Sequence, residues 1–257
     1  MLPLGRSNSS FPSLEQRVRT EFRLSLAALA VAAIFWVLGS CGSDEPSAPT
    51  ATPVPTPTPV SVEELLRIAG EATGALKTFH FRLNHEGGGT PLAPGLTVTE
   101  ADGDVVSPGA ISIDFAGTLG SFAVRSSLIT IGDDSYMTNP LTDAWEGVPR
   151  EVSPLGFFDP QKGIGSMMTS VLSPSIASLD EDEFVVTGDL PAEALRPLLG
   201  NSVEGTTVSV ELTIDARTHF LNKAVLDGRV TAPEPDGVVR IITLSKFNEP
   251  MDIRPPE

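Results

Sequence analysis

Strand-like alternation of apolar and polar residues dominates the chain beyond residue 78. It is cleanest over residues 79–84, 111–115 and 207–214, where every second side chain is apolar. Clusters of Gly, Asp and Asn separate these segments and favour turns. Because alternation gives each strand one apolar and one polar face, the pattern predicts a long antiparallel sheet that is apolar on one side. Further candidate strands fall at 104–106, 122–131, 184–187, 222–230 and 239–247.

Helical patterns occur at three places. Ser61 and Glu64 form a capping box, and apolar residues follow at three- and four-residue spacing as far as Leu76. Shorter candidates lie at 163–172 and at 191–199, where the second begins with a proline. A few helices beside one long sheet indicate an α+β domain, in which helices on one face cover the apolar side of the sheet.

The first 40 residues carry the pattern of an export signal. Residues 24–38 form an uncharged apolar run of 15 residues, and Arg17, Arg19 and Arg23 precede it. A membrane span usually needs about 20 apolar residues, so this run favours a cleaved signal peptide at 1–40. An uncleaved anchor helix is the alternative.

The segment after the apolar run is a lipobox, in which an aliphatic residue and two small residues precede a cysteine. It spans residues 38–41 and reads LGSC, and Cys41 is the only cysteine of the chain. This resembles the signals of bacterial lipoproteins, which implies that a diacylglyceryl group joins the Cys41 sulfur and that Cys41 becomes residue one. Acyl chains such as palmitate then anchor the protein on the extracytoplasmic face of the cell membrane. An unmodified cysteine is the alternative.

A proline-rich segment separates Cys41 from the rest of the chain. Residues 41–60 contain six prolines between Pro46 and Pro59, a composition that favours extended polyproline geometry. At about 3.1 Å per residue, the segment reaches roughly 60 Å. We therefore expect a spacer that holds a single domain, residues 61–257, away from the bilayer.

Composition and charge narrow the function classes. Of the 257 residues, 40% are hydrophobic and 19% are charged, which is typical of a folded chain. The net charge of −16 disfavours nucleic acid as a partner, because nothing would neutralise its phosphates. A single cysteine excludes an internal disulfide and a cysteine-rich metal site. We expect no metal and no cofactor.

The sequence contains no catalytic motif of weight, so we do not expect an enzyme. It lacks G-x-S-x-G, H-E-x-x-H and the P-loop. The acidic clusters at 100–104 and 180–183 miss the spacing of an EF-hand, and we interpret them as solvated loops. His80 and His85 are expected to face solvent. Paired carboxylates for glycoside hydrolysis are an alternative, although the mature chain has only one Tyr and one Trp as stacking platforms for sugars.

A series of short landmarks runs along the mature chain. They read TFHF at 78–81, GDVVSP at 103–108, IGDDSYMTNP at 131–140 with Trp145 beyond it, FDPQKGI at 158–164, VTG at 186–188, ID at 214–215 and IITLSKF at 241–247. As a series at these spacings, they resemble the LppX–LprAFG lipoproteins. These are lipid carriers of bacterial cell envelopes, related in shape to general lipoprotein carriers.

The resemblance implies both a fold and a function. The fold is α+β, a strongly bent antiparallel β-sheet (half-barrel) with helices on the concave face enclosing an apolar cavity. Members of the family bind acylated lipids, such as a glycolipid, triacylglycerol or phospholipid, and carry them within the envelope, sometimes beside a lipid exporter. We therefore expect a monomeric lipid carrier. A ligand-free scaffold or sensor of the envelope, with a filled core, is the alternative.

Ten apolar residues are candidates for the wall of the cavity. Six lie on the apolar phase of predicted strands, and four lie on the predicted helix at 163–172, whose methionines adapt to varied acyl chains. Plain core packing is the alternative for each of them. The ten are Ile113, Phe115, Leu128, Val208, Val210, Leu212, Ile164, Met167, Met168 and Leu172.

Overall fold

The computed structural model of the chain describes residues 60–149 and 159–257. The predicted signal peptide, Cys41 and almost all of the predicted spacer lie outside the described residues. The helical elements are α1 (Val62–Gly74), α2 (Pro160–Thr169), the 3₁₀ helix η2 (Ala192–Leu195) and α3 (Arg196–Leu199). The strands are β1 (Thr78–Glu86), β2 (Thr90–Ala93), β3 (Leu96–Val106), β4 (Ala110–Leu119), β5 (Phe122–Ile131), β6 (Asp134–Thr138), β7 (Trp145–Val148), β8 (Leu172–Leu179), β9 (Glu183–Pro191), β10 (Thr207–Asp215), β11 (Leu221–Asp227) and β12 (Val239–Ser245).

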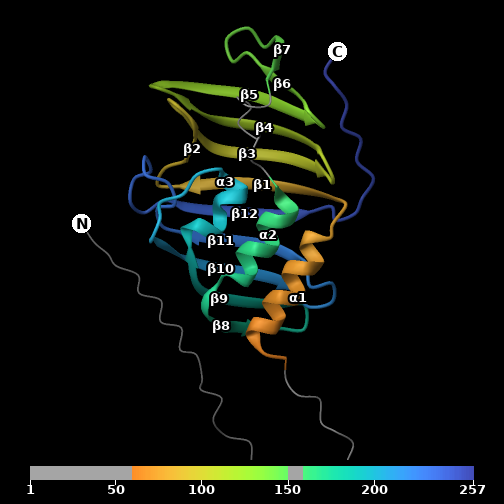
Figure 1. The fold of residues 1–257 in the computed structure, drawn as a ribbon, viewed down its shortest axis with the longest axis vertical. Coiled ribbons are helices and arrows are strands. Elements are labelled where there is room, and N and C mark those ends of the chain that lie inside the picture. The colour runs from red at the N-terminus through yellow and green to blue at the C-terminus, as the bar shows by residue number, and fades with distance from the viewer. Residues whose placement is uncertain (1–59, 150–158) are drawn as a thin grey trace, which may run out of the picture. The chain divides into compact units, whose positions relative to one another are not determined.

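The described strands form one antiparallel sheet. Its 12 strands are ordered β7-β6-β5-β4-β3-β1-β12-β11-β10-β9-β8, with β2 paired to β3 (Figure 1). The first strand lies in the middle, because β1 pairs with β3 on one side and with β12, from the end of the chain, on the other. Two meanders are thereby joined into one sheet that leaves β7 and β8 as open edges. The prediction of a long antiparallel sheet is confirmed.

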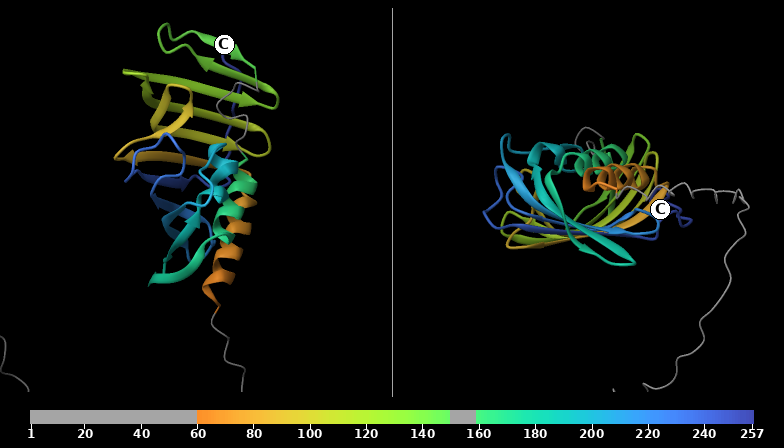
Figure 2. Two further views of the ribbon diagram at one scale, coloured as in Figure 1. Left: turned by 60° about the vertical axis from the view of Figure 1, so that its left-hand side comes forward. Right: turned by 90° about the horizontal axis from the view of Figure 1, so that it is seen from below.

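The helices lie on one face of this sheet. In Figure 1 they stand in front of β1 and β8–β12, and Figure 2 shows the sheet bending toward them. The predicted cap of α1 is present, since the Glu64 N–H donates to Ser61 Oγ over 3.2 Å. Two glycines bring α1 and α2 together: a Cβ added to Gly70 would lie 3.3 Å from the Gly165 Cα. The helices therefore pack against each other as well as on the sheet.

The helix predicted at 163–172 is shifted in the structure. It begins at Pro160, capped by Asp159, and ends at Thr169. Pro174 prevents a helix from continuing past Ser173, because proline disfavours helical geometry in the residue before it and lacks an N–H of its own. The chain instead leaves the helix at Ser170 and pairs with β9 from Leu172 onward. Leu172 therefore opens strand β8 instead of closing the helix.

The apolar core lies on the face of the sheet that the helices cover. Cross-strand pairs such as Ile113 and Leu128 place buried side chains opposite one another. Leu190, Leu212 and Ile214 have no exposed surface at all. Within the described residues, no helix is long and apolar enough to cross a membrane.

Candidate functional site

An apolar pocket lies between the sheet and the helical layer. Its volume is about 130 Å³. Strands β1, β11 and β12 form one wall, and α2, η2 and α3 contribute to the other. The residues that line it are Phe79, Phe81, Leu83, Ile164, Met167, Leu195, Leu198, Leu199, Leu221, Ala224, Leu226, Arg240, Ile242 and Leu244. We call this set the apolar pocket.

Strand alternation builds the sheet side of the apolar pocket. In β1, the alternate side chains of Phe79, Phe81 and Leu83 line it, and the antiparallel register sets Phe81 opposite Leu244 and Leu83 opposite Ile242. Facing side chains on neighbouring strands lie about 5 Å apart at Cβ, so they form a continuous apolar surface. The sheet wall is therefore fixed by backbone pairing.

Small residues allow the helical side of the apolar pocket to close. A Cβ added to Gly163 would lie 2.5 Å from Leu198 Cδ2, so at this distance between α2 and α3 any larger residue would require the Leu198 side chain to shift. Ile164 and Met167 then reach the pocket from α2, and both are buried. The closure rests on interdigitated side chains, without a hydrogen-bonded ladder across the two walls.

The volume of the apolar pocket limits what it holds in this conformation. An apolar cavity of about 150 Å³ stays dry and accepts a molecule the size of benzene. Pockets for drug-sized ligands begin at about 300 Å³. The pocket therefore has room for a short hydrocarbon segment, and a lipid with two acyl chains needs the walls to separate.

A buried ion pair lies beside the apolar pocket. Arg240 and Glu234 contact each other with side chains only 1% and 0% exposed. Burial raises the pKa of Glu234, but the hydrogen bond and charge of Arg240, together with the N–H groups of Val230 and Thr231, outweigh burial and hold that pKa below its usual value. The carboxylate thus stays ionised, and the single charged residue of the pocket lining is neutralised locally.

A chain of hydrogen bonds continues from this ion pair to a histidine. Arg240 Nε donates to Thr90 Oγ1 over 3.1 Å, and Thr90 Oγ1 lies 2.8 Å from His85 Nε2. His85 Nδ1 lies 2.8 Å from the Thr99 carbonyl oxygen, which only accepts, so Nδ1 carries the proton and Nε2 accepts from Thr90. Burial lowers the pKa of His85, and the nearby Arg240 lowers it further. The histidine is therefore held neutral.

Both histidines of β1 differ from the expectation that they face solvent. His85 is partly buried in the chain of hydrogen bonds just described. The His80 side chain is only 15% exposed, with Nδ1 2.8 Å from Asp104 Oδ1. The alternating pattern places His80 on the polar face correctly, but neighbouring acidic residues cover it there.

The structure brings some of the ten candidate cavity residues together and separates others. Ile164 and Met167 line the apolar pocket. Leu172 lies on the edge strand β8 and is 49% exposed. The other seven are buried in the core outside the apolar pocket: Ile113, Phe115, Leu128, Val208, Val210, Leu212 and Met168.

Most of the pocket lining was not among the candidates. Phe79, Phe81 and Leu83 carry the clean alternation that predicts β1, so the strand itself was recognisable from the sequence. No local pattern shows that β1 pairs with β12, about 160 residues later in the chain, and this pairing places these side chains under the helices. Leu198 and Leu199 belong to a predicted helix whose docking position no local pattern encodes.

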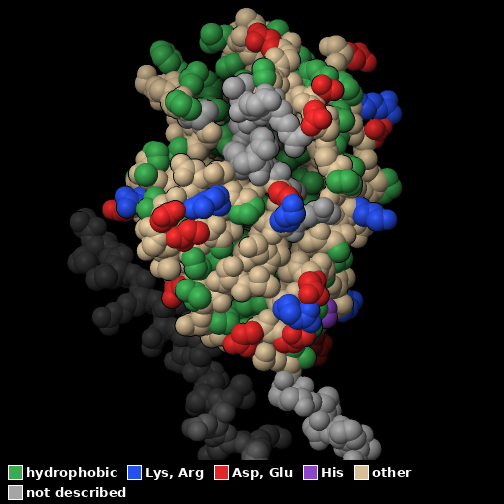
Figure 3. All heavy atoms as spheres, viewed as in Figure 1, with side chains coloured by type: hydrophobic (Ala, Val, Ile, Leu, Met, Phe, Trp, Pro, Cys, Tyr) green, Lys and Arg blue, Asp and Glu red, His purple; other side chains and the backbone are tan. Residues whose placement is uncertain are grey.

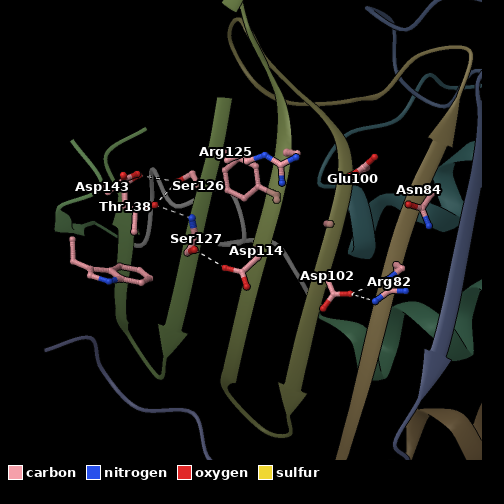
Figure 4. A pocket seen from close by; sticks show the side chains of 14 residues that line it. Arg82, Asn84, Glu100, Asp102, Asp114, Arg125, Ser126, Ser127, Thr138 and Asp143 are labelled. Carbon is pink, nitrogen blue, oxygen red and sulfur yellow. Dashed lines mark hydrogen bonds and ion pairs between the residues drawn. The ribbon is translucent and has the colours of Figure 1, made fainter. Parts of the chain in front are cut away.

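A larger hollow of about 580 Å³ lies on the other face of the sheet, and its lining mixes charged and polar side chains with Ala101, Phe115, Ala116 and Trp145. Figure 4 shows Arg82, Asp102, Asp114 and Ser127 in a row across β1, β3, β4 and β5. Arg82 Nε donates to Asp102 Oδ2 over 2.8 Å, and Ser127 Oγ donates to Asp114. The two carboxylates are thus engaged with neighbours, an arrangement that stabilises a solvated sheet face.

Across the described ranges, no group of three or more His, Cys, Asp or Glu side chains is placed to hold a metal.

Comparisons with known proteins agree on one family. The family model described as LppX_LprAFG lipoprotein matches residues 61–253. The structure of LprF from Mycobacterium bovis is similar with a TM-score of 0.56 at 19% identity, covering 76% of this chain and 96% of LprF. LppX from Mycobacterium tuberculosis gives a TM-score of 0.52 at 19% identity, covering 75% of this chain and 98% of LppX. The comparison with curated proteins finds no match.

Proposed function

Because this chain belongs to the LppX_LprAFG lipoprotein family, we propose that it binds acylated lipids in the apolar pocket and carries them within the cell envelope. The observation that carries the proposal is the apolar pocket itself, a hydrocarbon-lined space between sheet and helices. A glycolipid, triacylglycerol or phospholipid supplies the hydrocarbon that such a space accepts. No catalytic group is needed, because binding and release change no covalent bond.

Reversible lipid transport favours a pocket that is apolar but binds lipid no more tightly than a membrane does. Each CH₂ group gains about 0.8 kcal/mol on leaving water, but a lipid in a bilayer has already left water. A carrier therefore needs a pocket about as favourable as the membrane, so that lipid both enters and leaves. A pocket of about 130 Å³ that enlarges around its cargo fits this requirement.

In this proposal, the apolar pocket enlarges by movement of its helical wall. The sheet wall is fixed by the pairing of β1 with β12 and of β12 with β11. The helical wall consists of α2, with 10 residues, and of η2 and α3, with four residues each. Its contacts are side-chain packing, so an acyl chain that displaces Met167 and Leu198 replaces one apolar contact by another.

Attachment to the membrane is the second part of the proposal. Residues 1–40 act as the signal peptide, Cys41 carries the lipid, residues 41–60 form the spacer, and residues 61–257 form the lipid-binding domain. The lipobox, the single cysteine and the family match support this organisation. The tether keeps the domain on the extracytoplasmic face, within reach of membrane lipid and of any exporter that delivers it.

A ligand-free scaffold or sensor is the second candidate function, and one observation favours it. The apolar pocket is below the usual size of a ligand site, and much of the remaining core is fully buried. A domain of this kind folds without cargo and acts through its surface. The two candidates differ in whether lipid enters the pocket.

Photo-crosslinking tests which of these functions applies. We would incubate the protein with phosphatidylglycerol that carries a diazirine in one acyl chain, irradiate it and map adducts by peptide mass spectrometry. The lipid-carrier proposal predicts adducts on residues of the apolar pocket, with Met167 and Leu198 among them. Adducts confined to the outer face of the sheet, or none above a control without irradiation, would support the scaffold.

A further inference from the structure

Three exposed apolar side chains gather at one end of the sheet. Phe122 and Leu119 are cross-strand partners at the tip of the β4–β5 hairpin, 74% and 45% exposed. Leu141 is 91% exposed in the loop between β6 and β7, which opens toward the same end because β6 runs antiparallel to β5. Figure 3 shows hydrophobic side chains projecting there, at the upper left. We call Leu119, Phe122 and Leu141 the hairpin-tip patch.

The turn that carries Leu119 and Phe122 and the turn beside it are uncharged. The segments at 91–98 and 116–124, which form the β2–β3 and β4–β5 turns, contain no Lys, Arg, Asp or Glu. The two turns are held together, since the Gly120 N–H donates to the Gly95 carbonyl over 2.8 Å. The adjacent tips therefore present one firm, uncharged projection.

The opposite end of the same strands has the reverse character. Its turns lie at 107–109 and 132–133 and consist of Ser, Pro, Gly and Asp. Among the described residues, no large hydrophobic side chain that is exposed lies in these turns. The apolar character therefore belongs to one end of this half of the sheet.

A lipid bilayer suits the hairpin-tip patch better than a protein partner does. A stable protein interface buries about 800 Å² on each side over a matched surface, whereas these side chains project from separate tips. Aromatic and aliphatic side chains at a firm, uncharged tip are suited to the interfacial layer of a membrane. The predicted spacer after Cys41 reaches roughly 60 Å, which lets the tethered domain turn this end toward the bilayer.

The other exposed apolar residues of the fold are placed less well for a membrane. Leu172, Ile176 and Leu179 lie on β8, and Leu179 directly precedes the acidic residues at 180–183. Four carboxylates so close oppose contact with an anionic bilayer surface. The charge pattern thus distinguishes the hairpin-tip patch from the β8 edge.

We propose that the hairpin-tip patch inserts into the surface of the bilayer and docks the domain there for lipid exchange. The role in lipid exchange rests on the proposed function. Docking itself rests on the exposure of Phe122, Leu119 and Leu141 and on the lack of charge in the segments 91–98 and 116–124; the loop at 139–144 that carries Leu141 contains one acidic residue, Asp143. A carrier that docks shortens the distance that an acyl chain travels through water.

Site-specific fluorescence tests the docking. The acylated protein is placed in phosphatidylcholine vesicles with an NBD probe on Ser121→Cys, between Leu119 and Phe122, or on Asp134→Cys at the opposite end. Doxyl-labelled lipid should quench the probe at 121 and shift its emission to the blue, while the probe at 134 should behave as in water. Phe122→Ser should lower the docked fraction about tenfold, from the hydrophobic free energy of one side chain.

Control variants separate docking from folding and from lipid carriage. Leu179→Ser on β8 should leave the probe at 121 quenched, and the melting temperature of each variant should match that of the parent. A probe at 121 that stays in water, or quenching that Leu179→Ser abolishes, would overturn the docking proposal. Native mass spectra of the same samples report bound lipid: lipid bound without docking rejects only the docking, and docking without bound lipid rejects the carrier.

Discussion

Arg240 shows how a single residue depends on its partners in this fold. It is the one charged residue that lines the apolar pocket, and Glu234 contacts it in surroundings that exclude water. Its Nη1 also donates to the Gly228 carbonyl over 3.1 Å. An isolated charge at this depth would be costly, so the side chain is tolerated only because each partner is in place.

Removal of one member of this pair should destabilise the protein strongly. We expect Arg240→Met to cost about 3–5 kcal/mol in the free energy of unfolding, because it leaves the Glu234 carboxylate buried without its counter-ion. Urea titration followed by circular dichroism measures the loss. Arg82→Met is the matched control, since its ion pair with Asp102 is exposed and contributes at most about 1 kcal/mol. Equal losses for the two variants would contradict this account of the buried pair.

His85 should make the stability of the protein depend on pH. Its pKa is lowered in the folded state, so below about pH 6.5 the unfolded chain binds the proton more readily than the folded one does. Stability is therefore present above this pH and falls as the pH drops. Glu234, whose pKa is also lowered, adds a further loss below about pH 4.5.

The contribution of His85 can be isolated by substitution. His85→Gln removes the titrating ring, so we expect the free energy of unfolding to change less between pH 7 and pH 5 than in the parent protein. His219→Gln, at a turn far from this site in the sequence, is the control. Urea titrations at several pH values measure the slope. A parent slope that His85→Gln leaves intact would rule out His85 as the source.

At the scale of elements, the sequence indicated most of the sheet. Clean alternation predicted β1, β4 and β10, and the limits of β5 agree with the predicted 122–131. The strands β2 and β7, with four residues each, are too short to display a period, and β8 exposes side chains on both faces. Local pattern therefore failed where a strand has no consistent apolar face.

The apolar pocket was less predictable than the strands around it. Alternation shows that Phe81 and Ile242 face the core, but no local signal tells that their strands are neighbours. Nor does the sequence reveal that Gly163 fits against Leu198. A cavity depends on gaps between elements, and such gaps follow from packing over long sequence separations.

Filling the apolar pocket should reduce lipid binding without unfolding the protein. Ala224 lines the pocket on β11, so Ala224→Phe places a ring in the space for hydrocarbon. Ala101→Phe on β3 is the matched control, because Ala101 is equally a buried alanine but lies outside the apolar pocket. Both variants should cost about 1–3 kcal/mol through overpacking. Only Ala224→Phe should lower the amount of lipid per protein, and equal lipid content in both would contradict the location of the site.

At the scale of the whole molecule, the proposed organisation joins a lipid-binding domain to a membrane through a spacer. The domain is acidic overall: without residues 1–40, the chain keeps 13 basic and 31 acidic residues, a balance that does not favour attraction to an anionic membrane. We therefore propose that Cys41 retains the protein at the membrane, with the hairpin-tip patch as a weaker and reversible contact.

Loss of the predicted acylation site should release the protein. We expect Cys41→Ser to move most of the protein from the membrane fraction to the soluble extracytoplasmic fraction if the signal is still removed, or to leave an unprocessed precursor. Ser43→Ala is the control and should keep the membrane location. Cell fractionation with intact mass measurement distinguishes these forms. A Cys41→Ser protein with the mass and location of the parent would show that Cys41 carries no lipid.

The presence of noncovalent lipid in the purified protein tests the central claim most directly. Native mass spectra of the protein from its own membranes would be compared with denaturing spectra, in which the covalent anchor stays and any cargo leaves. We expect a native mass that exceeds the denatured mass by one acylated lipid, which organic extraction removes for identification. Identical native and denatured masses, unchanged after the protein is offered lipid, would contradict the carrier and favour a ligand-free scaffold.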